Sequence, residues 1–339
     1  MIGPTFFSYT QTIAGEFARR GIEVVDFDEK RSNRKRSKIA YRLGLGVGAN
    51  SAQSRYLAGL ADRIIAAGYP DVLLVGVEVI DRATVAMLVA AGVRVHLYMW
   101  DGSANKGRFR DYLDLLATRA TFDPSDSKSY DMAYVPLFSE PLFDDGQPVE
   151  TRYDLSFCGT MHSLRVAIVA RLLSAPWAKD LRLGLLLYYH SRALFVFKSL
   201  AQPAGLRVLP LIRDTAFPKE QVARLSRESR AVLDIPHPGQ AGLTARTYEA
   251  LTAGARLITF NRLAGEMLPP AFASRVVVID RIDDLATIDM TAPRPGPLGD
   301  EEKYYLSLDR FVDQLLALMT GDPDSQRTTL PPISPARIA

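Results

Sequence analysis

One stretch decides the fold: Leu233-Asp-Ile-Pro-His-Pro-Gly-Gln-Ala-Gly-Leu-Thr-Ala-Arg-Thr-Tyr-Glu-Ala-Leu-Thr-Ala-Gly-Ala-Arg-Leu-Ile-Thr-Phe-Asn261. The apolar run before it predicts a strand that ends at Ile235, and a loop with two glycines follows. The next residues predict a helix from Leu243 to Ala253, which Gly254 ends. Another apolar run predicts a strand from Arg256 onward. The stretch therefore predicts a strand, a helix and a second strand in direct succession.

The loop and the first turn of that helix carry groups suited to an anion. Backbone N–H groups and the helix dipole favour negative charge there. Thr244, Arg246 and Thr247 add hydroxyl and guanidinium donors for a diphosphate, and Glu249 is suited to bind two ribose hydroxyls. On spacing alone, a plain strand–turn–helix with polar caps is an equal alternative. The predicted nucleotide-sugar site also includes the loop residues His237, Gly239, Gln240, Gly242 and Leu243.

The same alternation of strand-length and helix-length patterns extends along the chain. Near-continuous apolar strands separated by helices are typical of a parallel sheet that is covered on both faces. Strands are predicted at 22–27, 71–77, 93–100, 153–158, 181–187, 206–212, 231–235, 256–260 and 275–279. Helices are predicted at 12–20, 52–67, 82–91, 163–173, 191–201, 219–226 and 243–253. The sequence thus predicts an α/β protein with two tandem doubly wound Rossmann-like domains that face a cleft.

A proline-rich linker near residues 136–149 separates the two halves of this pattern. We expect an N-terminal acceptor-binding domain at 1–148 and a C-terminal nucleotide-sugar-binding domain at 149–299. A helix at 300–320 is expected to pack back across the domains. The Pro-, Ser- and Thr-rich tail 321–339 is predicted to be disordered.

The residues around Glu249 resemble the C-terminal nucleotide-binding motif of the GT-B glycosyltransferases. Glu249-Ala-Leu-Thr-Ala-Gly254-Ala-Arg-Leu-Ile258 stands where those enzymes have E-A-L-A-x-G-x-x-x-I. The longer string is similar to bacterial proteins of lipopolysaccharide-core and exopolysaccharide synthesis and to a spore-maturation-protein-like family. The resemblance implies a nucleotide-diphosphate sugar as donor substrate and no cofactor. Many retaining members have a second glutamate where this chain has Ala241, so an inverting reaction is favoured.

Two further segments add candidate residues. Gly159 and Thr160 follow the strand that opens the second domain, and Arg165 could reach the same anion, although a surface arginine in a first helical turn is the simpler interpretation. Asp101 follows the strand 93–100 and is our first candidate for a catalytic base, with a helix-capping role as the alternative. The reserve candidates at the end of another strand are Asp28 and Glu29.

A basic run, Lys30-Arg-Ser-Asn-Arg-Lys-Arg-Ser-Lys38, suggests a partner that bears phosphate. It is either a solvated loop or a patch for anionic lipid headgroups or a polyprenyl-diphosphate-linked acceptor. The residues assigned to this patch are Arg31, Arg34, Lys35, Arg36 and Lys38. Nucleic acid is not predicted, because the net charge is only +3 and no aromatic residues interleave the run.

Composition sets the remaining bounds. The chain has 339 residues with one cysteine, which excludes an intramolecular disulfide and favours a reducing compartment. No apolar run is long enough to cross a bilayer, and the start lacks a signal-peptide pattern, so we expect a cytoplasmic protein or one at the inner face of the cytoplasmic membrane. The four histidines are scattered, and Asp26-Phe-Asp28 is an isolated D-x-D, so no metal site is predicted.

These observations predict a metal-independent, inverting glycosyltransferase. It would move a sugar from a nucleotide-diphosphate sugar to a cell-surface glycan or a lipid-linked acceptor. A nucleotide-sugar epimerase or hydrolase of the same fold is one alternative. A non-enzymatic, two-lobed small-molecule binding protein is the other.

Overall fold

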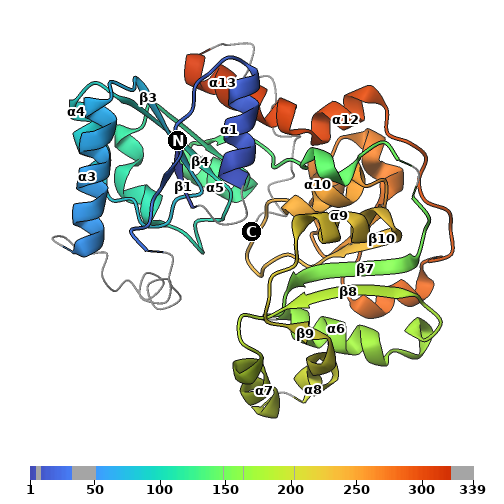
Figure 1. Ribbon diagram of the computed structural model, residues 1–339. Helices are drawn as coiled ribbons and strands as arrows, with labels where there is room; N and C mark the ends of the chain where they lie inside the picture. The colour runs from blue at the N-terminus through green and yellow to red at the C-terminus, as the bar shows by residue number, and fades with distance from the viewer. Residues whose placement is uncertain (5–8, 33–50, 148, 163, 202, 322–339) are drawn as a thin grey trace. The chain divides into compact units, whose positions relative to one another are not determined.

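The computed structural model describes residues 1–4, 9–32, 51–147, 149–162, 164–201 and 203–321. The chain forms two compact units, each built on a parallel sheet (Figure 1). Of the described residues, the first unit comprises 1–136 and 308–321, and the second comprises 137–307. No helix of the described chain is both long and apolar enough to span a bilayer.

Within the described residues, the first sheet has six strands in the order β2-β1-β3-β4-β5-β6. They are β1 Ile2–Gly3, β2 Phe27–Asp28, β3 Asp71–Val75, β4 Arg94–Met99, β5 Thr118–Thr121 and β6 Ala133–Tyr134. The helices are α1 Tyr9–Arg19, α3 Ala52–Ala66, α4 Arg82–Ala90, α5 Pro124–Tyr130 and α13 Leu308–Thr320. A 3-10 stretch runs over Arg108–Leu115. Apolar side chains of β3 and β4 form the core with the inner faces of α3 and α4, as Leu74, Leu97, Leu57 and Leu88 show.

In the part of the second unit that is described, six strands follow the order β12-β11-β10-β7-β8-β9. They are β7 Tyr153–Thr160, β8 Leu183–Tyr188, β9 Ile212–Arg213, β10 Ser229–Asp234, β11 Arg256–Thr259 and β12 Val276–Val278. The helices are α6 Leu164–Ser174, α7 Arg192–Ala201, α8 Ala204–Val208, α9 Lys219–Arg227, α10 Ala245–Thr252, α11 Ala264–Met267 and α12 Asp300–Leu306. Leu155, Phe157, Leu233 and Ile258 lie fully buried at the centre.

The division of the chain differs from the expected boundary at 148. Residues 137–147 belong to the second unit, because Phe143 is buried there and Glu140 forms an ion pair with Lys219 of α9. The expected single helix 300–320 is also two helices, since Ser307 is extended (φ −81°, ψ 158°). The chain passes between the units at this break, with α12 in the second unit and α13 in the first.

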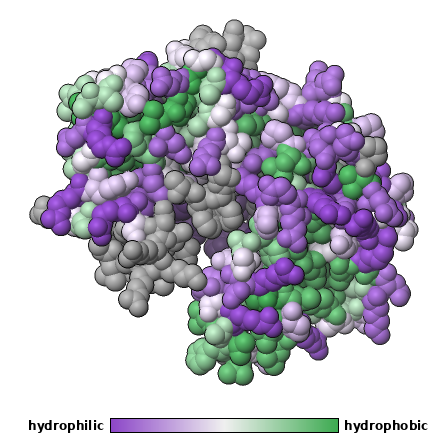
Figure 2. All heavy atoms as spheres, in the orientation of Figure 1, coloured by the Kyte–Doolittle hydropathy of each residue, from purple (hydrophilic) through white to green (hydrophobic). Residues whose placement is uncertain are grey.

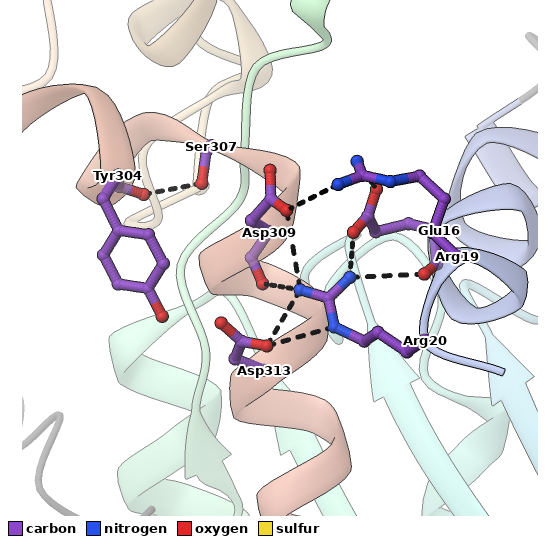
Figure 3. Close-up of polar contacts among 7 residues, drawn as sticks. All are labelled: Glu16, Arg19, Arg20, Tyr304, Ser307, Asp309 and Asp313. Carbon is purple, nitrogen blue, oxygen red and sulfur yellow. Dashed lines mark hydrogen bonds and ion pairs between the residues drawn. The ribbon is translucent and has the colours of Figure 1, made fainter. Parts of the chain in front are cut away.

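Helix α13 is held in the first unit by charge and by aromatic packing. Arg20, just after α1, donates to the Asp313 carboxylate (2.8 Å) and to the Asp309 carbonyl oxygen (3.1 Å), and it also pairs with Glu16 (Figure 3). The Phe311 ring meets Tyr98 of β4 edge-on, with centroids 4.8 Å apart. These contacts join residues far apart in the sequence, so composition and periodicity do not predict them.

Two predicted strands are wrong in large part. The run 206–212 forms most of α8 and a 3-10 turn at Leu209–Leu211, and only Ile212 pairs as strand. Short apolar runs fit a helix as well as a strand, and here Gly205 packs so closely on Ser199 that a Cβ would overlap the hydroxyl. The run 22–27 pairs only at Phe27, and the Val25 carbonyl oxygen instead accepts from the chain's amino terminus (2.7 Å).

Candidate functional site

The candidate site of the second unit lies at the carboxyl edge of its sheet. Strand β7 ends at Thr160, and the parallel strands β10 and β11 end at the paired residues Asp234 and Thr259. Helix α10 begins just after the loop that leaves β10 (Figure 1). In open parallel sheets, this edge is where ligands bind.

Asp234 is the buried centre of this edge. Its Oδ1 accepts from the Thr244 hydroxyl (3.0 Å), and its Oδ2 lies 3.4 Å from the Thr247 hydroxyl and 3.3 Å from that of Thr259. Burial raises the pKa of the Asp234 carboxyl, against the lowering effect of the Thr244 hydrogen bond and of Arg165. Thr244 and Thr247 were expected to meet a diphosphate, but the structure directs both hydroxyls to Asp234, and Thr247 is fully buried. They fix the start of α10 to the end of β10.

Arg165 joins the ends of β7 and β10. Its Nε and Nη2 donate to the carbonyl oxygen of Ile235 at 2.8 and 2.6 Å, and its Nη1 donates to that of Thr160 at 3.3 Å. Burial lowers the pKa of the Arg165 guanidinium, and the Asp234 charge opposes this. A Cβ on Gly159 would lie 3.0 Å from the Phe157 ring, so this turn is tightly packed. Arg165 therefore sits at the predicted edge, where backbone carbonyls occupy its donors.

Side chains hydrogen-bond to the backbone carbonyls of the loop between β10 and α10. Gly239 adopts φ +82°, a left-handed conformation that favours glycine. The Gln240 side chain donates to the Gly242 carbonyl oxygen (3.2 Å), and Asn261 Nδ2 donates to that of Ala241 (3.0 Å). His237 Nδ1 donates to the Pro238 carbonyl oxygen (2.8 Å). These bonds hold the loop in one shape in front of α10, and Leu243, two residues before the helix, is buried.

Arg246 and Glu249 form the charged pair of this edge. Arg246 Nη1 lies 2.7 Å from Glu249 Oε2, and the two side chains are 18% and 10% exposed. Both charges act on Cys158 near the end of β7, whose thiol pKa is raised mainly by burial. The structure thus brings Arg246 and Glu249 close to the carboxyl end of β7. The His162 and His237 rings also lie close, with centroids 5.5 Å apart.

In the first unit, Asp101 lies just beyond β4. Its Oδ2 is 2.6 Å from Lys106 Nζ, which also donates to the Gly76 carbonyl oxygen (3.3 Å). The Asp101 side chain is 37% exposed. Gly76 has φ +58°, and a Cβ there would overlap the Trp100 indole. The position after β4 therefore presents a partly exposed carboxylate with a lysine partner.

The reserve carboxylates at the end of β2 are arranged differently. Glu29 is fully buried, and its Oε2 accepts from the backbone N–H groups of Glu78 (2.7 Å) and Val79 (2.8 Å). Burial raises the pKa of the Glu29 carboxyl. Asp28 Oδ1 accepts from the Lys30 N–H (2.8 Å). Glu29 thus supports the segment after β3, whereas Asp101 is partly exposed.

Part of the predicted basic patch can be located. The Arg31 N–H donates to Gln53 Oε1 (3.1 Å), and the residue is exposed. Arg34, Lys35, Arg36 and Lys38 lie outside the described residues. In the described part of the chain, no group of three or more His, Cys, Asp or Glu residues could hold a metal ion.

Sequence reasoning missed several residues that shape these two edges. Asp234, Thr259 and Asn261 each end or follow a strand, and a polar residue directly after a buried strand is the signal that could have found them. Lys106 has no such signal, because the turn after β4 brings it back to Asp101. All four act by holding another group in place.

Solved structures share this architecture. The trehalose-phosphate synthase of Burkholderia xenovorans aligns with a TM-score of 0.53 at 13% identity, over 78% of this chain and 76% of its own. HepE of Anabaena, solved with UDP, aligns with 0.57 at 9%, over 94% and 98%. The UDP-GlcNAc 2-epimerase of Neisseria meningitidis, solved with UDP-GlcNAc, aligns with 0.54 at 8%, over 95% and 98%.

The chain has the GT-B fold. These similarities and the two parallel sheets show an α/β protein with two Rossmann-like domains, as the sequence predicts. At such identities the likeness extends to the fold alone. No protein-family model matches the sequence, and the search of curated proteins finds no match.

Proposed function

We propose that this GT-B chain is a glycosyltransferase that takes its sugar from a nucleotide-diphosphate donor bound to the second unit. The observation that carries the proposal is the Arg246–Glu249 pair, held on α10 at the carboxyl edge of the sheet. HepE and the 2-epimerase were solved with a uridine nucleotide, which supports a nucleotide sugar as ligand. The acceptor is a cell-surface glycan or a polyprenyl-diphosphate-linked sugar.

The second unit offers a site for each part of the donor. The Glu249 carboxylate accepts from two ribose hydroxyls, while its contact with Arg246 keeps the guanidinium in place for the diphosphate. The loop 237–243 follows β10 and the turn at Gly159–Thr160 ends β7, and both serve this site in the proposal. Positive charge from Arg246 and the α10 dipole stabilises the leaving nucleoside diphosphate, so the proposed reaction needs no metal.

Asp101 is the proposed base. It takes the proton of the acceptor hydroxyl as that oxygen bonds to the anomeric carbon and the bond to the diphosphate breaks, which inverts the centre. Lys106 Nζ lies 2.6 Å from Asp101 Oδ2 and holds the carboxylate in position.

Binding of the donor is tested by calorimetry with UDP-, GDP-, dTDP- and CMP-sugars. We expect one nucleotide class to bind, and Glu249→Ala to weaken it by at least about tenfold, because two hydrogen bonds to a charged group are lost. Glu220→Ala, which removes an exposed glutamate from the first turn of α9, is the matched control and should bind as the wild type does. Unchanged affinity in Glu249→Ala would contradict the assignment.

A nucleotide-sugar 2-epimerase is the second candidate, because the epimerase structure aligns as well as the synthase does. The two are separated by incubating the donor that binds with and without a glycan acceptor and following it by NMR. Release of nucleoside diphosphate only with acceptor supports the transferase. An inverted C2 centre without acceptor supports the epimerase, and absence of both with a tightly bound ligand supports a binding protein.

A further inference from the structure

Helix α7 exposes apolar side chains where a surface helix ordinarily exposes polar ones. Only Phe195 and Ser199 of its described side chains are buried. Phe197 is 70% exposed and Leu200 71% exposed. The helix therefore packs on its unit through a narrow seam and leaves large apolar groups in solvent.

The exposed apolar residues of α7 form a stripe. With about 100° between successive residues of a helix, Ala193, Val196, Phe197 and Leu200 fall within one sector of about 100°. The buried seam at Phe195 and Ser199 lies on the opposite side. The stripe therefore points away from the core of the second unit.

Neighbouring segments extend this surface. Gly205 of α8 packs directly on Ser199, and Arg192 Nη1 donates to the Ile212 carbonyl oxygen (3.4 Å). These contacts place the exposed Leu206 and Leu211 beside α7. Figure 2 shows hydrophobic residues gathered over α7 and α8. We call the set Phe197, Leu200, Leu206 and Leu211, with the rest of the stripe, the α7–α8 surface.

The charges around this surface have one sign. Residues 190–213 contain Arg192, Lys198, Arg207 and Arg213 and no aspartate or glutamate, and Asp214 is the first acid after them. On the helical wheel, Arg192 and Lys198 flank the stripe on its two sides. All four cations are exposed. Apolar residues bordered by cations are the pattern of a helix that lies in the interface of an anionic bilayer.

We propose that the α7–α8 surface docks the protein on an anionic lipid bilayer. Phe197 and Leu200 enter the boundary between headgroups and acyl chains, and the four cations contact lipid phosphates. The charge pattern favours this partner over a second copy of the chain, since two such surfaces would bring like charges together. This docking is independent of the nucleotide-sugar site and of the basic run at residues 30–38.

Vesicle flotation with the full-length protein tests the proposal. We expect flotation with vesicles of phosphatidylcholine and phosphatidylglycerol, little with phosphatidylcholine alone, and weaker binding as NaCl rises from about 0.1 to about 0.5 M. The double variant Phe197→Ser/Leu200→Ser should lose at least about tenfold in affinity for the anionic vesicles. Lys198→Glu/Arg207→Glu should lose the preference for anionic lipid. Val89→Ser, an exposed apolar residue of α4, is the control.

The double variant should fold normally, because both side chains are exposed, and circular dichroism and donor binding verify this. Retained flotation of Phe197→Ser/Leu200→Ser, with loss on neutralising Arg34, Lys35 and Arg36, would overturn the proposal in favour of the basic run. No flotation of the wild type, with a dimer that the double variant converts to a monomer in light scattering, would assign the surface to a second copy.

Discussion

At the carboxyl edge of the second sheet, one buried carboxylate, Asp234, accepts from three threonine hydroxyls. At the carboxyl edge of the first sheet, charged side chains pair with one another. Asp101 pairs with Lys106, and Lys30 pairs with Glu78. Both edges carry an ion pair, which is Arg246–Glu249 in the second unit, but the second unit adds a buried carboxylate held by hydroxyl donors.

The difference matches two kinds of task. Hydroxyl and amide contacts are directional and buried, so they hold a loop in one shape for a ligand. Partly exposed ion pairs contribute little free energy, so breaking one costs little. The carboxylate can then leave its lysine and accept a proton from a substrate. On the proposed function, the second unit supplies a fixed binding edge and the first unit supplies a reactive edge.

The largest expected effect concerns the reactive edge. On the proposed function, Asp101→Asn should lower kcat by about 10²–10⁴-fold with the donor KM unchanged, because the amide cannot take the acceptor proton. The asparagine oxygen can still accept from Lys106, so the fold should persist. Asp28→Asn is the control. Normal turnover of Asp101→Asn with loss in Asp28→Asn would move the base to β2.

Substitutions at the fixed edge should change the stability of the second unit. Asp234→Ala leaves three hydroxyls without their acceptor and removes a countercharge of Arg165, so we expect a loss of about 3–5 kcal/mol in the free energy of unfolding. Donor binding should fall with it. Asp234→Asn keeps an acceptor oxygen and should lose much less. Urea unfolding measures both, and equal losses would show that the charge, not the hydrogen bonding, matters.

Asp234→Asn also tests the pH dependence of the second unit. Burial raises the folded-state pKa of Asp234 above its ordinary value of 3.8, so the folded state binds the proton more tightly than the unfolded state does. The resulting stabilisation is full at low pH and is lost as pH rises through the folded-state pKa. The wild type should lose stability relative to Asp234→Asn as pH rises across that window.

How much of this the sequence predicts depends on the range of the interaction. Helix α3 begins at Ala52 as predicted, because an apolar periodicity and Ser51 as N-cap define it locally. The placement of Glu249 and Arg246 on one helix follows in the same way. The partners of Asp234 do not, because they come from the start of α10 and from β11, and their approach to β10 depends on strand register. The break at Ser307 likewise requires knowledge that α13 packs on α1.

A glycine tests how tightly the reactive edge is packed. Gly76→Ala should cost about 1–3 kcal/mol, because its Cβ would overlap the Trp100 indole beside Asp101. Gly92→Ala is the matched control, since Gly92 also has a positive φ (+82°) but a Cβ there would meet no atom within 4 Å. It should lower the free energy of unfolding by only about 1 kcal/mol. Trp100 fluorescence in a Trp177→Phe background should shift in Gly76→Ala alone. Equal losses of stability in the two variants would show that the backbone conformation, and not the overlap with Trp100, determines the effect.

The smallest expected effect is a pH dependence of stability in the first unit that is opposite to the one in the second. His96 of β4 is buried between Asp71 and Thr118, at 3.0 and 2.8 Å, and burial lowers its pKa despite the opposing effect of Asp71. Because the unfolded histidine gains a proton near pH 6.5 and the folded one gains it only at lower pH, the first unit loses stability as pH falls, opposite in sign to the Asp234 effect. From pH 7.5 to 5.5 this amounts to at most about 1.4 kcal/mol.

Tryptophan fluorescence can follow the unfolding of the first unit by itself. The chain has two tryptophans, Trp100 in the first unit and Trp177 in the second, so in a Trp177→Phe variant the fluorescence change during urea unfolding reports the first unit alone. A His96→Gln variant in that background should lose less stability on acidification, and an equal loss would show that another group titrates.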